Sequence, residues 1–334
     1  MPRLKVLYAG SPAAAARTLE LLIEYSADAE CGFEICGVLS NPPTAKGRHK
    51  TPTPTPVALT AEKFGLTCLT PEHLNAECRE QVSILAPDIL VCFAYGHIFG
   101  PKFLSLFKFG GLNLHPSALP KYRGCSPVNA AILNRDTETV FTVQTLSLAM
   151  DEGNIVRQKK IALTGAETAG SLLNAAAEDG AALLCDAISE ISRTGQLPAG
   201  TPQIGEASYT TVISKDDAQI DWTKSAEEID AFVRAYSPEP CAWTTENGSA
   251  LKILAGKIFS GVRAAGADET AVCGTVLQFE KNAGILVQCG GGIYAVTELQ
   301  RQGKNAAKAK DFINGARGFI NTVLGGQECG IKKT

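Results

Sequence analysis

No stretch of the 334-residue chain is apolar over the roughly 18 residues that a membrane-spanning helix needs. Residues 4–9 form an apolar run that is too short for a secretory leader, and Gly10-Ser11-Pro12 ends it, so it favours a first strand. The chain also lacks a large excess of either charge, because 31 lysines and arginines against 34 acidic residues leave a net charge of −3. This balance excludes a surface that is basic throughout, but it allows a local basic patch for nucleic acid.

Cysteines at the close spacing of a metal or redox site are absent as well. The 11 cysteines are scattered, and no two of them form a Cys-x-x-Cys pair. In a chain of this size without an export signal, they are most simply reduced core residues. We therefore expect a cytoplasmic protein that has no membrane segment and binds no metal ion.

The first half of the chain alternates strand and helix patterns. Short apolar runs predict buried strands at residues 4–9, 33–39, 89–94 and 111–114. Apolar residues three or four apart predict helices at residues 13–25, 57–64, 73–85 and 168–193. Because apolar strands that alternate with helices form a parallel sheet covered on both faces, we expect an α/β domain over residues 1–195.

A segment rich in glycine and proline follows, and we expect residues 196–207 to form a linker with little to pack. Beyond it, a helix is predicted at 226–235, and strand-like runs separated by glycines lie at 250–255, 274–278, 284–289 and 293–299. Short strands with turn signals predict a small, open β-barrel of the oligonucleotide-binding (OB-like) kind over residues 208–334.

Polar residues gather where the fourth predicted strand ends. Asn113 and His115 lie two residues apart, so an extended strand places both side chains on one face. Ligands of open α/β sheets bind beyond the carboxyl ends of strands, where an amide and an imidazole can hold a carbonyl oxygen and move a proton. From spacing alone an alternative stays open, in which Asn113 caps a turn and His115 is an ordinary, partly buried histidine.

Asp151 follows another apolar run and precedes a glycine turn. A carboxylate beside His115 would orient the imidazole and favour its protonated form. Asp-x-Gly is also a common turn sequence, and the spacing alone does not decide whether Asp151 reaches His115.

These residues resemble the signature of the folate-dependent formyltransferases, Asn113-x-His115-x-Ser117-x-Leu119-Pro120-x-x-Arg123-Gly124 followed by Asp151-x-Gly153. Further stretches resemble the members of that family whose acceptor is methionyl-tRNA, namely Ala9-Gly10-x-Pro12, Gly47-Arg48-His49-Lys50, Ala94-Tyr95-Gly96, Ile220-Asp221-Trp222, Arg234-Ala235-Tyr236-Ser237-Pro238-x-Pro240, Ala242-Trp243 and Leu299-Gln300-x-x-Gly303-Lys304. The chain departs from the family pattern at Ser11, Ala13-Ala14, Ala118 and Asn154, none of which is one of the three catalytic positions.

The resemblance implies a Rossmann-like catalytic domain followed by a C-terminal barrel. It implies that the catalytic residues are Asn113, His115 and Asp151, and that the folate-binding residues are Ser117, Ala118, Leu119 and Pro120. It also implies 10-formyltetrahydrofolate as the formyl donor and charged initiator tRNA as the acceptor, with no metal ion and no protein partner.

Positive charge is concentrated in two segments. Lys46, Arg48 and Lys50 are the charged residues of segment 41–56, and the last 36 residues carry an excess of five positive charges, with Arg301 and Lys304 first among them. Such charge on an acidic protein suits contact with tRNA phosphates, although a solvated surface is the simpler alternative for either segment taken alone.

Other acceptors are known for the same signature, namely amino sugars, glycinamide ribonucleotide and water, and none of them needs the two basic segments. An RNA-binding module without catalysis is a further alternative, and the complete Asn–His–Asp set argues against it. We therefore expect an enzyme that formylates methionyl initiator tRNA for translation initiation.

Overall fold

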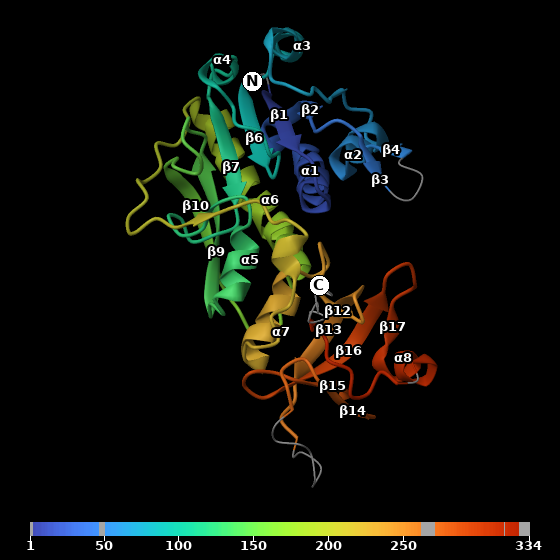
Figure 1. Cartoon of the computed structure of the whole chain (residues 1–334). Helices are drawn as coiled ribbons and strands as arrows, with labels where there is room; N and C mark the ends of the chain where they lie inside the picture. The colour runs from blue at the N-terminus through green and yellow to red at the C-terminus, as the bar shows by residue number, and fades with distance from the viewer. Residues whose placement is uncertain (1–2, 47–50, 262–270, 317, 327–334) are drawn as a thin grey trace, which may run out of the picture. The chain divides into compact units, whose positions relative to one another are not determined.

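Strand β1 (Leu4–Gly10) lies near the middle of a seven-stranded sheet, whose order is β10-β9-β7-β6-β1-β2-β5. The computed structural model describes residues 3–46, 51–261, 271–316 and 318–326 (Figure 1). Contacts divide the chain into two units. The first consists of the residues up to Val128, Glu138–Leu163 and Ser171–Val212, and the second of Asn129–Thr137, Thr164–Gly170 and the residues from Ile213 onward.

Five strands of the first unit are parallel, and helices connect them. The strands are β1, β2 (Phe33–Leu39), β5 (Cys68–Leu69), β6 (Ile89–Phe93) and β7 (Gly111–His115). The helices are α1 (Ala13–Ser26), α2 (Pro56–Lys63), α3 (Ala76–Leu85) and α4 (Pro101–Leu104), and α6 (Ala169–Thr194) follows later in the chain. The predicted α/β class is confirmed, and the strand order reverses between β1 and β6.

The other edge of the sheet is antiparallel, so the sheet is mixed rather than wholly parallel. Strand β9 (Glu138–Thr145) runs against β7, and β10 (Ile155–Ala162) runs against β9. A short loop joins β9 to β10 as a hairpin, which makes the pair antiparallel by necessity. Strand β10 escaped prediction because Arg157, Lys159 and Lys160 interrupt its apolar pattern, as charged residues do on edge strands.

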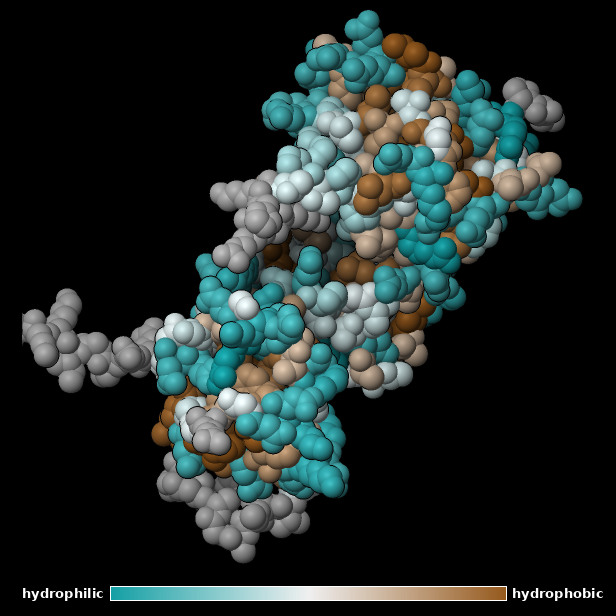
Figure 2. Space-filling model, turned by 90° about the vertical axis from the view of Figure 1, so that its right-hand side faces the viewer, coloured by the Kyte–Doolittle hydropathy of each residue, from teal (hydrophilic) through white to brown (hydrophobic). Residues whose placement is uncertain are grey.

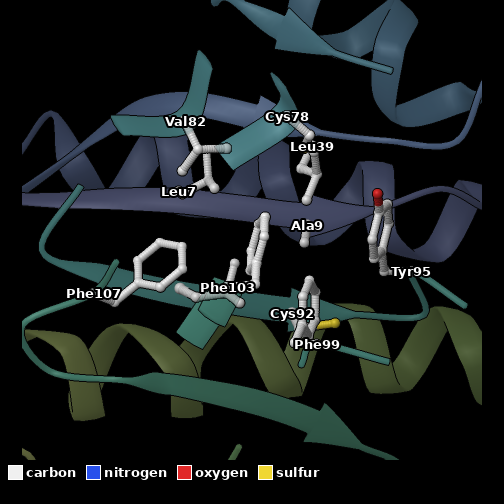
Figure 3. Close-up of a cluster of buried hydrophobic side chains, with 11 residues drawn as sticks. Leu7, Ala9, Leu39, Cys78, Val82, Cys92, Tyr95, Phe99, Phe103 and Phe107 are labelled. Atoms are coloured by element: carbon white, nitrogen blue, oxygen red, sulfur yellow. The ribbon is translucent and has the colours of Figure 1, made fainter. Parts of the chain in front are cut away.

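The two faces of the sheet bury different side chains. Leu7 and Ala9 of β1 point into an apolar cluster that also contains residues of α3 and Phe103 of α4 (Figure 3). Tyr8 lies between them in sequence and points to the opposite face, where its hydroxyl donates to the carbonyl oxygen of Ala15 in α1 at 2.7 Å. The alternation of the strand therefore assigns each side chain to one helical layer.

Strand β7 divides its side chains in the same way. Leu114 faces α6, where a Cβ on Gly180 would lie 2.3 Å from Leu114 Cδ2. Asn113 faces the other side, because it pairs with Cys92 of β6, which belongs to the cluster of Figure 3. His115, two residues on, shares the face of Asn113, as their spacing predicted.

The second unit is built on an antiparallel sheet of order β12-β13-β16-β15-β14, with β17 paired to β16. Its strands are β12 (Trp243–Glu246), β13 (Ser249–Ile258), β14 (Val276–Glu280), β15 (Gly284–Gln288), β16 (Ile293–Arg301) and β17 (Ala307–Lys308), and its helices are α7 (Ala226–Ala235) and α8 (Ala309–Gly315). Register shifts near Ala255 mark irregularities in β13, and such bulges increase the local bend of a strand. The predicted open barrel is confirmed as a curled antiparallel sheet.

Residues 195–212 pack on the first unit, whereas the composition of residues 196–207 predicted a linker with little to pack. Thr201 and Ile155 exchange two backbone hydrogen bonds of 2.8 and 2.9 Å. Strand β11 (Tyr209–Thr210) pairs in parallel with β8 (Arg123–Gly124). The first unit therefore extends beyond the predicted boundary at residue 195. The sequence did not predict this, because backbone and amide groups rather than apolar side chains make these contacts.

The helix α5 (Pro127–Leu133) begins in the first unit and ends in the second.

Hydrophilic residues interrupt the apolar ones on the face shown in Figure 2. Within the described part of the chain, no helix is long and apolar enough to cross a membrane.

Gly10→Ala should destabilise the first unit, because a Cβ at this position would lie 2.7 Å from the carbonyl oxygen of Phe93 and 2.8 Å from the Cβ of Ala15. Overpacking of this kind costs about 1–3 kcal/mol, which urea unfolding followed by circular dichroism measures. Gly100→Ala is the matched control, since a Cβ there meets no atom of the described residues within 4 Å. Equal stability of the two variants would contradict the close approach of β1 to β6 and α1.

Candidate active site

Side chains from two distant places in the chain meet over β7. Asn113 Nδ2 donates to Asp151 Oδ1 at 3.3 Å, and His115 Nδ1 lies 3.5 Å from the same oxygen. Asn113 and His115 stand on β7, whereas Asp151 lies in the loop between β9 and β10. The structure therefore brings together the three residues that the sequence marked as catalytic, and their catalytic roles stay a prediction.

Asp151 receives hydrogen bonds from several directions. Gln144 Nε2 donates to Oδ1 at 2.8 Å, and the backbone N–H of Gly124 donates to Oδ2 at 2.7 Å. The side chain of Asp151 is only 11% exposed, so these donors replace water around the carboxylate. Its φ angle is +55°, a left-handed conformation that costs about 1–2 kcal/mol for a residue with a side chain. The surroundings of the loop must therefore stabilise this turn.

The ring of His115 has a fixed orientation. Nε2 lies 2.9 Å from the carbonyl oxygen of Tyr122. Because a carbonyl oxygen only accepts, Nε2 carries a hydrogen and donates it. A neutral ring therefore presents the lone pair of Nδ1 on the side of Asp151.

Burial lowers the pKa of His115, which is 4% exposed, while the Asp151 carboxylate and the Tyr122 carbonyl act in the opposite direction. The neutral ring is thus the form present near neutral pH. The sequence predicts that Asp151 favours the protonated ring. Its charge does act in that direction, but the loss of water around the imidazole outweighs it.

The Ser117–Pro120 loop is largely buried and makes internal contacts. Ser117 Oγ donates to the carbonyl oxygen of Lys121 at 2.6 Å, and Thr142 Oγ1 donates to the carbonyl oxygen of Ser117 at 2.8 Å. These bonds fix the backbone of the loop, which places the Tyr122 carbonyl beside the ring of His115. Direct contact of the four loop residues with a folate stays a prediction.

Arg123 connects this loop to the segment that follows α6. Its Nη1 donates to Glu152 Oε1 at 2.7 Å and to the Tyr209 hydroxyl at 3.0 Å. Its Nε and Nη2 donate to Gln203 Oε1 at 3.1 and 2.8 Å. The guanidinium of Arg123 therefore joins its own strand to the β9–β10 loop, which carries Asp151, and to the segment after α6.

Gln144 and Gln203 were not predicted from the sequence, and Arg123 was predicted without a role. Gln144 lies beside Asn113 because the two residues pair across β9 and β7, a neighbourhood that only the strand order reveals. Gln203 lies in a segment that composition marked as a linker. Arg123 was part of the recognised signature but carried no assigned function.

Two buried polar atoms of the first unit, Asn41 Oδ1 and the Tyr95 hydroxyl, have no hydrogen-bond partner among the described residues. Asn41 Nδ2 donates to the carbonyl oxygen of Tyr95 at 3.0 Å, so the two residues are neighbours just beyond β2 and β6. Open α/β sheets bind ligands where the strand order reverses, here between β1 and β6. The two unpaired atoms suit a ligand that carries both donors and acceptors. In the described ranges, no group of three or more His, Cys, Asp or Glu side chains is arranged to hold a metal ion.

The predicted tRNA-binding residues have different surroundings. Arg301 donates to both carboxylate oxygens of Glu246, at 2.7 and 2.5 Å, and its guanidinium lies 4.5 Å from the ring centre of Phe312. Lys304 is exposed, in the turn after β16. The backbone of Lys46 ends strand β3 (Thr44–Lys46), which pairs with β4 (Thr51–Thr53). The side chain of Lys46 and all of Arg48 and Lys50 lie outside the described residues.

The chain matches two family models along its length. The model described as formyl transferase matches residues 3–188, and the model described as formyl transferase, C-terminal domain, matches residues 212–317. Among curated proteins, the chain is similar to the methionyl-tRNA formyltransferase of Treponema denticola. The two are 38% identical over 326 residues, which cover 95% of this chain and 98% of that protein.

Solved structures share the fold at lower identity. The methionyl-tRNA formyltransferase from Clostridium thermocellum has a TM-score of 0.56 and 16% identity, with 78% of this chain and 95% of that chain covered. HypX from Aquifex aeolicus in complex with tetrahydrofolic acid has a TM-score of 0.61 and 12% identity, with 94% of this chain and 47% of that chain covered. At these identities the structures support the fold alone.

The His115 ring should titrate with a midpoint below pH 6.5, because burial lowers its pKa. Asp151→Asn should move the midpoint lower still, since it removes the negative charge that favours the imidazolium. NMR of the ring protons measures both, with His115→Gln to assign the resonance. Glu152→Gln is the control, because this neighbouring carboxylate binds Arg123 instead of the ring. A midpoint above 6.5, or one that rises in Asp151→Asn, would contradict this account.

Proposed function

Because the chain belongs to the methionyl-tRNA formyltransferase family, we propose that it transfers the formyl group of 10-formyltetrahydrofolate to the α-amino group of methionine on initiator tRNA. The observation that carries this proposal is the hydrogen-bonded cluster of Asn113, His115 and Asp151 in a chain whose two halves both match formyl transferase models. The product is the formylated initiator tRNA of translation initiation.

The first task of the site is to stabilise the oxygen of the formyl group. Attack of a neutral amine on the formyl carbon leaves a negative charge on that oxygen. A primary amide has two hydrogens, so Asn113 donates one to Asp151 and offers the other to the oxyanion. A donor in such a position is typically worth about 3–4 kcal/mol of the barrier.

The second task is to remove a proton from the attacking amine. The lowered pKa of His115 supplies a neutral ring, and its Nδ1 lone pair accepts the proton. The imidazolium that results has two acceptors in place, the Tyr122 carbonyl at Nε2 and Asp151 near Nδ1. Asp151 thus stabilises the ring after the proton has arrived. When the carbon–nitrogen bond to the folate breaks, the same ring returns the proton to the leaving nitrogen, and no covalent enzyme intermediate forms.

The folate is expected where the strand order reverses between β1 and β6. The unpaired Asn41 Oδ1 and Tyr95 hydroxyl support this position, because a pterin ring carries donors and acceptors on one edge. A neighbour of the same fold, HypX, holds tetrahydrofolic acid. The buried Ser117–Pro120 loop supports the site by fixing the backbone next to the catalytic ring.

Two groups of positive charge support tRNA binding, the Lys46, Arg48 and Lys50 segment after β2 and Lys304 in the second unit. Arg301 is a weaker candidate, since its guanidinium is already paired with Glu246. Phosphate contacts by such residues add affinity without reading sequence.

Transfer of labelled formyl from 10-formyltetrahydrofolate to charged initiator tRNA tests the proposed reaction. An amino-sugar nucleotide and glycinamide ribonucleotide serve as competing acceptors in parallel assays. Preferential transfer to either small acceptor would overturn the assignment of tRNA as the substrate.

His115→Ala should lower kcat by about 10²–10⁴-fold, because it removes the group that accepts the amine proton. Affinity for the folate should change little. His73→Ala is the control, because this second histidine is exposed and lies outside the cluster. Activity of His115→Ala close to that of the wild type would rule out the proposed mechanism.

Arg48→Ala and Lys304→Ala should each raise the tRNA concentration needed for half-maximal rate and reduce the salt slope of tRNA binding by about one. Steady-state kinetics at several salt concentrations measure both effects. Lys281→Ala, an exposed lysine between β14 and β15, is the control. If tRNA kinetics are unaltered while the KM for folate rises, the charged groups belong to the cofactor site.

A further inference from the structure

We propose that Gln203 is a positioning residue of the transfer reaction, which holds the Asp151 loop in its active conformation and ties it to Arg123. The role in catalysis rests on the proposed function. Gln203 belongs to the segment between α6 and β11, for which the sequence predicts no function. Its neighbours Pro202 and Ile204 are exposed, whereas Gln203 itself is half-buried and points inward.

Both ends of the Gln203 amide are fully used. Nε2 donates to the carbonyl oxygen of Asp151 at 2.7 Å and to that of Gly153 at 2.9 Å, and it lies 3.3 Å from Gln144 Oε1. Oε1 accepts from Nε and Nη2 of Arg123 at 3.1 and 2.8 Å. A flipped amide would turn its oxygen toward the carbonyl oxygens and its N–H groups toward the guanidinium, so only one orientation satisfies these partners.

The two carbonyls belong to a strained turn. Asp151 has a φ of +55°, which an L residue adopts only where its surroundings impose it. Gly153 is equally constrained, because a Cβ there would lie 1.7 Å from the carbonyl oxygen of Thr145. By holding the carbonyls on both sides of Glu152, Gln203 opposes relaxation of the turn. Relaxation would rotate the Asp151 carboxylate away from Asn113 and His115.

Other contacts hold the segment in place without Gln203. Thr201 and Ile155 exchange two backbone hydrogen bonds, and Asn154 Nδ2 donates to the carbonyl oxygen of Ala199 at 2.9 Å. This last bond needs an amide at position 154, where an aspartate would have no hydrogen to give. Loss of the Gln203 amide should therefore leave the segment docked and change the geometry of the turn alone.

The expected consequence is a defect in chemistry rather than in binding. Misplacement of a catalytic group by about 1 Å can cost about a hundredfold in rate, so Gln203→Ala should lower kcat about tenfold to a hundredfold. The KM values for folate and tRNA should stay within about twofold. Asp151 from the β9–β10 loop and the Tyr122 carbonyl from the loop after β7 face the His115 ring. If Asp151 turns away, the acid limb of the kcat profile moves to lower pH.

Two further variants separate the two ends of the amide. Gln203→Glu keeps an acceptor for Arg123 but loses both donors to the turn, so it should be as impaired as Gln203→Ala. Gln203→Asn keeps both kinds of group on a shorter side chain and should recover part of the rate. Gln196→Ala is the matched control, an exposed glutamine of the same segment.

The test measures kcat, both KM values and the kcat profile against pH for wild type and the four variants. In parallel, the His115 titration is followed by NMR without substrates. A lower kcat in Gln203→Ala and Gln203→Glu, together with a lower His115 midpoint in Gln203→Ala and no change in Gln196→Ala, is the expected result. Unchanged kcat and midpoint in Gln203→Ala, or full activity in Gln203→Glu, would overturn the proposal. If wild type transfers no formyl to tRNA, the proposed function fails, while the NMR result still shows whether Gln203 holds the loop.

Discussion

A buried carboxylate is the constraint on which the site in the first unit depends. Asp151 is 11% exposed, and an uncompensated charge at that depth costs several kcal/mol. Its partners come from β7 (Asn113), from β9 (Gln144) and from β8 (Gly124). The hydrogen bonds to Asp151 therefore fix the positions of these three segments, and the same bonds fix the carboxylate.

The direction of β9 explains how such distant residues become partners. Because β9 runs against β7, Gln144 pairs with Asn113, and the chain leaves β9 at the level of Leu112. The loop must then fold back over the sheet to begin β10, and Asp151 lies on that return path. Periodicity assigned Asn113 and His115 to one face correctly, since alternation is a local property of a strand. It carries no information on strand direction, so the contact between Asp151 and these residues rested on resemblance until the fold was known.

Local signals predicted most of the elements, and the failures share a cause. The helix at Ala226–Ala235 was predicted to the residue, and in the structure Ser225 and Glu228 form a capping box around its first turn. Strand β10 and the segment around Gln203 were missed, because their contacts use backbone groups, charged side chains and amides. Sequence patterns detect burial of apolar surface, whereas hydrogen bonds between polar segments leave no periodic trace. The parts of the site that sequence reasoning missed are accordingly the ones that position its catalytic residues.

The electrostatics of His115 follow from the competition between burial and the nearby carboxylate. From the sequence, only the charge of Asp151 could be considered, and that charge favours the protonated ring. In the folded chain the imidazole is 4% exposed, and the loss of hydration dominates, so the ring rests neutral beside a negative charge. A neutral base next to an acceptor is poised for proton uptake, because the attraction to Asp151 becomes favourable only once the proton has reached Nδ1. The interaction between His115 and Asp151 is therefore unfavourable while the ring is neutral and favourable once the ring has taken up the proton. An interaction that becomes stronger during the reaction lowers the barrier.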